Sequence, residues 1–174
     1  MSCRMTALLT LRPSTASDIA ALDVLLARSC PRLLAPDYPA SVHVLAIPLI
    51  SRARPELLAC GSCWLDLDPQ GGILGAGGWT QGAPGVPEDG YGRATGHIRQ
   101  FGTDARLTRR GIGRALMDRV RAQAGAAGMR RLDCLAMRAA VPFCAALGFQ
   151  EQGGVDVPLR PGIVFPDIRM LRLL

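Results

Sequence analysis

Residues 97–125 read HIRQFGTDARLTRRGIGRALMDRVRAQAG, and this stretch decides the fold. Its first part, 97–103, is a strand candidate, and a second short apolar strand is expected over 131–137. The segment between them, 111–125, has the periodicity of a helix with one apolar side, formed by Ile112, Leu116, Val120 and Ala124. A strand, a helix and a strand in this order predict a parallel crossover.

The turn before this helix has the composition of a phosphate-binding site. A helix N terminus leaves backbone N–H groups unpaired and carries partial positive charge. Gly111 and Gly113 lack Cβ atoms, so a ligand can approach the backbone closely. Formal charge is added by Arg109, Arg110 and Arg114. The combination predicts a pyrophosphate site, and the alternative is an ordinary helix start with surface arginines.

Two better-known phosphate motifs fit this turn poorly. A P-loop needs Gly-Lys-Ser/Thr, and the chain contains no lysine. A dinucleotide-binding fingerprint needs a third small residue where Leu116 stands.

The rest of the chain alternates strand and helix patterns around this unit. Helices are expected from Thr15 or Ser17 to about Arg28, over 41–47 and over 139–147, with Pro31 ending the first region and Gly148 closing the last helix. Strands are expected over 8–12, 62–68, 73–80, 150–157 and 164–173, and a loop over 81–95. This order predicts an α/β or α+β layer protein.

Length and composition limit the classes of protein to which this chain can belong. The 174 residues suit one domain, 1–174. The apolar runs are too short to span a bilayer, and no signal peptide is evident, so we expect a soluble, cytoplasmic protein without a membrane partner. The net charge of +6 leaves a nucleic-acid-binding module as an alternative, but aromatic residues make up only 5% and no binding motif is present. We therefore expect no nucleic-acid partner.

The six cysteines are dispersed, which favours free, largely buried thiols over a disulfide framework. Cys60 and Cys63 have the C-x-x-C spacing of redox and zinc sites. A second pair is absent and the only histidines are His43 and His97, so we expect no metal site.

Two motifs together resemble those of the GNAT superfamily of acyl-CoA-dependent N-acetyltransferases. Residues 108–113, TRRGIG, resemble the signature Arg/Gln-x-x-Gly-x-Gly/Ala, with Thr108 in its first position. Residues 141–149, VPFCAALGF, resemble the closing motif, in which a Phe-Tyr pair precedes Leu-Gly-Phe. Their order and spacing match, and the expected elements fit along nearly the whole chain.

The resemblance implies a mixed, V-shaped central sheet flanked by helices, with acetyl-CoA as co-substrate and no metal. It implies that the strand backbone of Phe101, Gly102 and Thr103 pairs with the pantetheine arm. It implies that main-chain amides cradle the pyrophosphate over Arg109, Arg110, Gly111, Ile112, Gly113, Arg114 and Ala115. The implied reaction is direct attack of a primary amine of a small molecule or peptide on the thioester.

Two polar residues that many GNAT members have are replaced in this chain. Cys144 stands where a tyrosine acid is common, and Met137 where an asparagine is common. Cys144 is either that acid or a small core residue, and His97 is either the base or a structural histidine. Glu88, Asp89, Trp79 and Tyr91 are candidates for acceptor contacts, with loop or core positions as the alternatives. A non-catalytic acyl-CoA-binding or regulatory protein is therefore the alternative function. The apolar strand 168–174 offers a surface for a homodimer.

Overall fold

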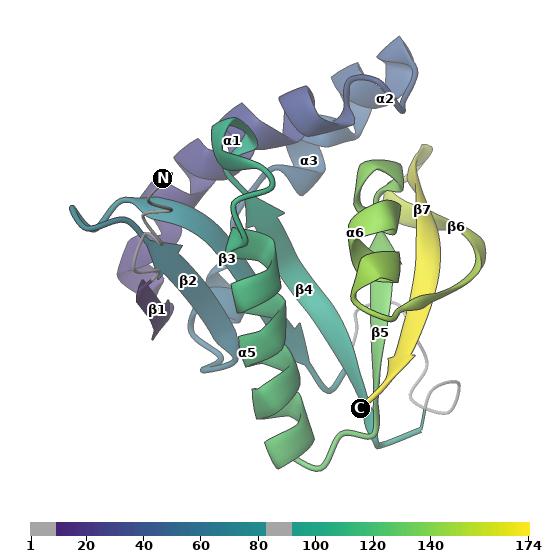
Figure 1. Ribbon diagram of the computed structural model, residues 1–174. Helices are drawn as coiled ribbons and strands as arrows, with labels where there is room; N and C mark the ends of the chain where they lie inside the picture. Colours follow the sequence, from purple (N-terminus) through teal and green to yellow (C-terminus); the bar gives the residue numbers. More distant parts are fainter. Residues whose placement is uncertain (1–9, 83–91) are drawn as a thin grey trace, which may run out of the picture.

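The computed structural model describes residues 10–82 and 92–174, and its centre is a seven-stranded sheet (Figure 1). The strand order is β1-β2-β3-β4-β5-β7-β6. The strands are β1 (Thr10–Pro13), β2 (Cys63–Leu67), β3 (Ile73–Thr80), β4 (Thr95–Thr103), β5 (Arg131–Ala136), β6 (Gln150–Arg160) and β7 (Ile163–Leu173). All neighbours are antiparallel except β4 and β5, which confirms the predicted parallel crossover.

The sheet opens between its two parallel strands. β4 and β5 share only three register pairs, of which His97 with Asp133 is the last, and the strands then diverge (Figure 1). A bulge accompanies the divergence, because β4 places one residue more than β3 between two register pairs. Gln100 lies in this bulge with φ of 51°. Its side chain accepts a hydrogen bond from the amide of Arg54 and donates one to the carbonyl of Arg52, which ties the bulge to a neighbouring loop.

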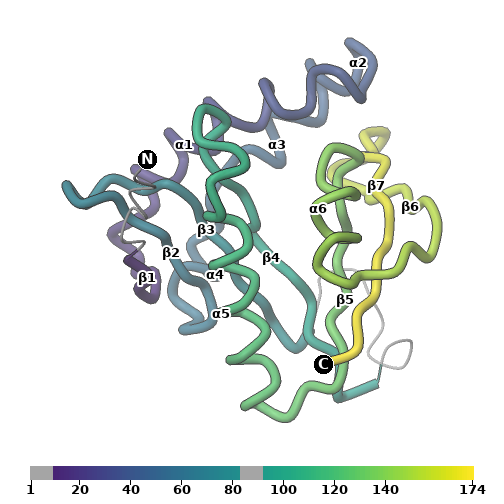
Figure 2. Tube along the Cα trace, viewed as in Figure 1, coloured from purple at the N-terminus to yellow at the C-terminus, as the bar shows by residue number. Residues whose placement is uncertain are grey.

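Helices cover both faces of the sheet, as Figure 2 shows along the Cα trace. They are α1 (Ile19–Leu34), α2 (Ala40–Leu45), α3 (Ile47–Ile50), α4 (Pro55–Leu58), α5 (Ile112–Ala126) and α6 (Val141–Ala146), with short 3-10 turns η1 (Ala16–Asp18), η3 (Ala105–Leu107) and η4 (Arg138–Ala140). Within residues 10–82 and 92–174, no helix is both long and apolar enough to cross a membrane.

The predicted end of the first helix was wrong. α1 continues through Pro31 to Leu34, and the buried Leu34 packs with Tyr38 and Phe165. Proline removes one helical hydrogen bond, and tertiary burial of the following turn offsets that cost. The last two strands also run further than predicted. β6 includes Pro158, which an edge strand tolerates because one side of its backbone pairs with no other strand.

Two apolar layers sandwich the sheet. Trp64 of β2 packs under α5 with Leu116 and Val120, whereas Cys63 and Leu65 pack under α1. The side chains of β2 therefore alternate between the two faces of the sheet. Leu116 and Val120 are fully buried, and each contributes about 1.5–3 kcal/mol from burial alone.

Glycines in β3 let helix α5 and strand β4 approach closely. A Cβ on Gly75 would lie 2.9 Å from Ile112 Cγ2, and one on Gly77 would lie 2.6 Å from the Phe101 ring. Since Ile112 and Phe101 both belong to the predicted cofactor site, these glycines set its position.

The C-terminal strand lies inside the sheet. β7, which contains most of residues 168–174, pairs with β5 on one side and β6 on the other. A homodimer through this strand would therefore use its side chains and not its backbone edge; the dimer stays a prediction.

Candidate functional site

A groove of about 910 Å³ opens where β4 and β5 diverge, between α1, the N terminus of α5 and α6. From β4 and the following turn it is lined by Phe101, Gly102, Thr103, Leu107, Thr108, Arg109, Arg110, Gly111, Ile112, Gly113 and Arg114. From the helices and the segment after β5 it is lined by Leu26, Ser29, Cys30, Leu33, Leu34, Met137, Ala139, Ala140, Pro142, Phe143, Ala146 and Leu147. The structure thus brings together every residue expected to bind the cofactor except Ala115, whose amide bonds to the Gly111 carbonyl at 2.9 Å.

The N terminus of α5 presents free amides to this groove. The first amide with a helical acceptor is that of Ala115, so those of Ile112, Gly113 and Arg114 have none within the helix. Gly111 adopts φ of 87° and Arg109 φ of 62°, both in the left-handed region. Alternation of left- and right-handed residues turns successive N–H groups inward, which makes an anion-binding concavity.

The three arginines of this turn leave their charges exposed. Arg109, Arg110 and Arg114 take part in none of the ion pairs found among the described residues. Their guanidinium groups add positive potential to the partial charge of the helix terminus. The turn is therefore suited to a multiply charged anion such as a pyrophosphate.

The end of β4 has an unpaired backbone edge facing the groove. No register pair joins β4 to β5 beyond His97, so the polar groups of Phe101–Thr103 on that side lack a strand partner. An extended ligand with amide groups can pair with such an edge. The Phe101 and Phe143 rings, with centroids 5.9 Å apart, form an apolar contact across the groove.

A buried aspartate that the sequence did not single out fixes the turn after β4. Asp104 accepts hydrogen bonds from the amide and side chain of Arg106 and from Nη2 of Arg28 at 2.6 Å. The hydrogen bond from Arg106 holds the pKa of Asp104 at about 2. The Ser29 hydroxyl accepts a hydrogen bond from the amide of Ala105. Asp104 thus anchors the phosphate turn to α1; its position directly after a strand was the only signal in the sequence.

Cys144 lies behind the groove and does not line it. The residue is 3% exposed and packs in the core under α5 and α6. A hydrogen bond with Cys144, together with burial, raises the pKa of the Cys134 thiol. The Cys144 side chain therefore faces β5, which fits the core position that the sequence left open.

His97 lies at the vertex of the divergence, at the last register pair of β4 and β5. It is 8% exposed, with Nδ1 3.6 Å from Asp133 Oδ2, and Asp133 also accepts from Arg169 at 3.0 Å. Burial lowers the pKa of His97 more than Asp133 raises it. His97 does not line the groove, and its surroundings are those of a buried structural network.

The other candidates for acceptor contacts separate into two groups. Trp79 is buried under α5 and donates from Nε1 to Gln123 at 3.2 Å, so it has a core position. Glu88, Asp89 and Tyr91 lie outside the described residues.

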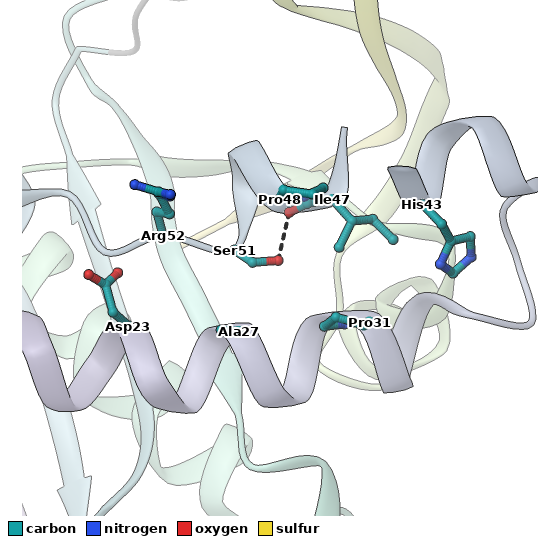
Figure 3. A pocket seen from close by; sticks show the side chains of 8 residues that line it. All are labelled: Asp23, Ala27, Pro31, His43, Ile47, Pro48, Ser51 and Arg52. Atoms are coloured by element: carbon teal, nitrogen blue, oxygen red, sulfur yellow. Dashed lines mark hydrogen bonds between the residues drawn. The ribbon is translucent and has the colours of Figure 1, made fainter. Parts of the chain in front are cut away.

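A second hollow, of about 520 Å³, lies between α1 and α3 (Figure 3). Two of its polar side chains already bond to the surrounding backbone. Asp23 accepts a hydrogen bond from the amide of Ala53 at 2.6 Å, and Ser51 donates to the carbonyl of Ile47 at 2.7 Å. Figure 3 shows His43 at the opposite end from Asp23 and Arg52. In the part of the chain that the structure describes, no three His, Cys, Asp or Glu side chains are placed to hold a metal ion.

A mixed sheet that splits between two parallel strands, with a glycine-built helix terminus at the split, defines a fold class of acyl-group transferases. A family model assigns the chain within this class, because the model described as "Acetyltransferase (GNAT) family" matches residues 25–149. The chain belongs to the acetyltransferase (GNAT) family.

Solved structures share this fold. A GCN5-related N-acetyltransferase from Rhodopseudomonas palustris matches with a TM-score of 0.76 and 20% identity over 95% of this chain and 96% of that one. A GNAT-family acetyltransferase from Staphylococcus aureus Mu50 matches with a TM-score of 0.67 and 15% identity over 95% and 98%. A phosphinothricin acetyltransferase from Sinorhizobium meliloti, solved with AcCoA, matches with a TM-score of 0.63 and 19% identity over 95% and 88%. No curated protein matches the chain.

Proposed function

We propose that this protein transfers an acetyl group from acetyl-CoA to a primary amine of a small molecule or peptide. The observation that carries the proposal is the groove at the split of β4 and β5, which joins an unpaired strand edge to an amide-rich helix terminus. Membership of the acetyltransferase family supports it. The related phosphinothricin acetyltransferase was solved with AcCoA, which supports the choice of donor.

In this proposal the two ends of the groove bind different parts of the donor. The amides of Ile112–Arg114 and the charges of the neighbouring arginines hold the pyrophosphate. The edge of β4 at Phe101–Thr103 pairs with the amides of the pantetheine arm, as one strand pairs with another. The thioester then lies between the diverging strands, at the end of the pantetheine arm away from the pyrophosphate.

The chemistry requires a neutral amine. Its nitrogen forms a bond to the thioester carbon, negative charge develops on the carbonyl oxygen, and the carbon–sulfur bond breaks. A main-chain amide of β4 stabilises that oxygen. The described part of the groove lining contains no Tyr, Asp, Glu or His, and Cys144 faces the core, so the leaving thiolate takes a proton from the amine or from water.

The alternative is a non-catalytic acyl-CoA-binding or regulatory protein. The observation that favours it is the same absence of Tyr, Asp, Glu and His from the described groove lining. Both functions predict that acetyl-CoA raises the melting temperature, because a ligand of the folded state stabilises it by mass action.

Thiol release separates the two functions. The full chain is incubated with acetyl-CoA and, in turn, tyramine, putrescine, glutamine and a lysine-containing peptide, and free CoA is measured. Release that depends on the amine supports the acetyltransferase. A stabilising shift without release for any amine supports the binding protein, and no shift at millimolar acetyl-CoA contradicts both.

A further inference from the structure

Asp167 in β7 is a carboxylate without a partner at the open end of the split sheet. It follows Pro166 and precedes Ile168, whose register partner is Ala136, the last residue of β5. Asp167 therefore lies just beyond the end of the β5–β7 ladder. Across from it the chain continues into Met137, which lines the groove.

Side-chain alternation places Asp167 on the face of the sheet opposite α5 and α6. Its neighbour Ile168 packs against the core under those two helices. Phe165, two residues earlier, packs with Tyr38 and Leu34 on the α1 side. Since residues two apart share a face, the Asp167 carboxyl points toward the α1 side.

The groove and the surroundings of Asp167 share residues. Leu34 and Met137 both line the groove and pack in the cluster around Tyr38 and Phe165. The Tyr38 hydroxyl donates to the carbonyl of Pro166 at 3.2 Å and accepts from the amide of Arg138 at 3.0 Å. This bridge fixes β7 beside the segment that follows β5, so Asp167 is held beside Met137, which lines the groove.

Asp167 lacks the arginine partner that three buried aspartates have. Asp18, Asp104 and Asp133 each pair with arginine, whereas no ion pair among the described residues includes Asp167. Its Oδ1 atom is inaccessible to water and receives no hydrogen bond. Asp66 is also unpartnered, but it is fully buried in β2. Asp167 is only half-buried, so part of the residue is open to solvent.

We propose that Asp167 binds the ammonium group of the acceptor and takes its proton, so that cationic primary amines are the acceptor class. This inference rests on the proposed acetyltransferase function.

The proton balance of the step is complete. The ammonium group gives one proton to the Asp167 carboxylate, and the neutral nitrogen attacks the thioester carbon. The carbon–nitrogen bond forms, the carbon–sulfur bond breaks, and the second proton of the nitrogen goes to the leaving thiolate. Asp167 returns its proton to solvent after the product leaves.

The charge environment fits this role. Burial raises the pKa of Asp167 to about 7, so the carboxyl accepts a proton readily near neutral pH. The titratable groups that interact with it are Tyr38 between α1 and α2 and Cys134 on β5. Asp37 and Arg138 lie near Tyr38, and Asp133 near Cys134, so these charges also border the site.

The test compares Asp167→Asn with wild type, using Asp66→Asn as a matched control for loss of an unpartnered carboxyl. The wild-type rate should rise with pH through about 7. Asp167→Asn should lose this rise and lower kcat/KM for the amine roughly 100-fold or more. The affinity of Asp167→Asn for acetyl-CoA should match that of wild type. Asp66→Asn should match wild type in kcat/KM and in the pH dependence of the rate.

The outcomes separate the two proposals. Wild-type kcat/KM and pH profile in Asp167→Asn would overturn the role of Asp167 and leave the acetyltransferase standing. If wild type turns over no amine, the proposed function fails. Binding of putrescine to the acetyl-CoA complex, measured by calorimetry, then decides on Asp167: loss of binding in Asp167→Asn supports the ammonium site, and equal or absent binding in both proteins refutes it.

Discussion

Alanine at Gly113 should weaken acetyl-CoA binding without destabilising the protein. A Cβ there would lie 3.1 Å from two atoms of the Phe143 ring and 3.8 Å from Thr103 Cγ2, inside the groove. The helical position itself favours alanine by up to about 1 kcal/mol. Loss of one amide–phosphate hydrogen bond costs about 1.5–3 kcal/mol, which predicts roughly 10- to 100-fold weaker binding.

Gly111→Ala is the matched comparison, because its Cβ would meet nothing within 4 Å but its φ is 87°. A left-handed alanine costs about 1–2 kcal/mol, so this variant should lose stability. Chemical denaturation without ligand and calorimetry with acetyl-CoA measure the two effects separately. Wild-type affinity in Gly113→Ala would refute the placement of the pyrophosphate against this helix terminus.

Three further predictions concern single side chains. Because the pKa of Asp167 is about 7 in the folded protein and 3.8 ordinarily, the stability of the wild type should fall as pH rises from about 4 to 7. Above pH 7, urea denaturation should show Asp167→Asn to be up to about 4 kcal/mol more stable than wild type. Equal stability of the two proteins would contradict the burial of Asp167. The pKa of Asp104 is about 2, so its contribution to the stability of the fold is present above about pH 4 and is lost as pH falls toward 2. Asp104→Asn should therefore be less stable than wild type at pH 7 and should lose less stability on acidification. Acid titration of both proteins measures this difference. Cys144→Ala should keep kcat within about threefold of wild type in the thiol-release assay, whereas a loss of roughly 100-fold would restore Cys144 as the acid.

The central unit of the fold could be predicted from local patterns. The helix over 112–126 and the strands on either side follow from apolar periodicity and from glycines at the turn. The position of the groove followed as well, because a helix terminus after a strand fixes where free amides lie. The end of the first helix was predicted too early because of Pro31. The burial of Leu34 outweighs the hydrogen bond that this proline removes.

The parts of the site that sequence could not reveal depend on contacts between distant segments. Asp104 meets Arg28 across 76 residues, and Tyr38 meets Pro166 across 128. The sequence pattern does not indicate which carboxylate pairs with a cation in the folded chain. Asp167 reads as one more polar residue in a strand, and only the three-dimensional arrangement shows that it is left unpaired beside the groove.

A crystal structure of the full chain with CoA tests the central claim most directly. The pyrophosphate oxygens should lie within about 3 Å of the amides of Ile112–Arg114, and the pantetheine arm should run along Phe101–Thr103 between the diverging strands. CoA bound elsewhere, or a groove that stays empty at saturating CoA, would contradict it.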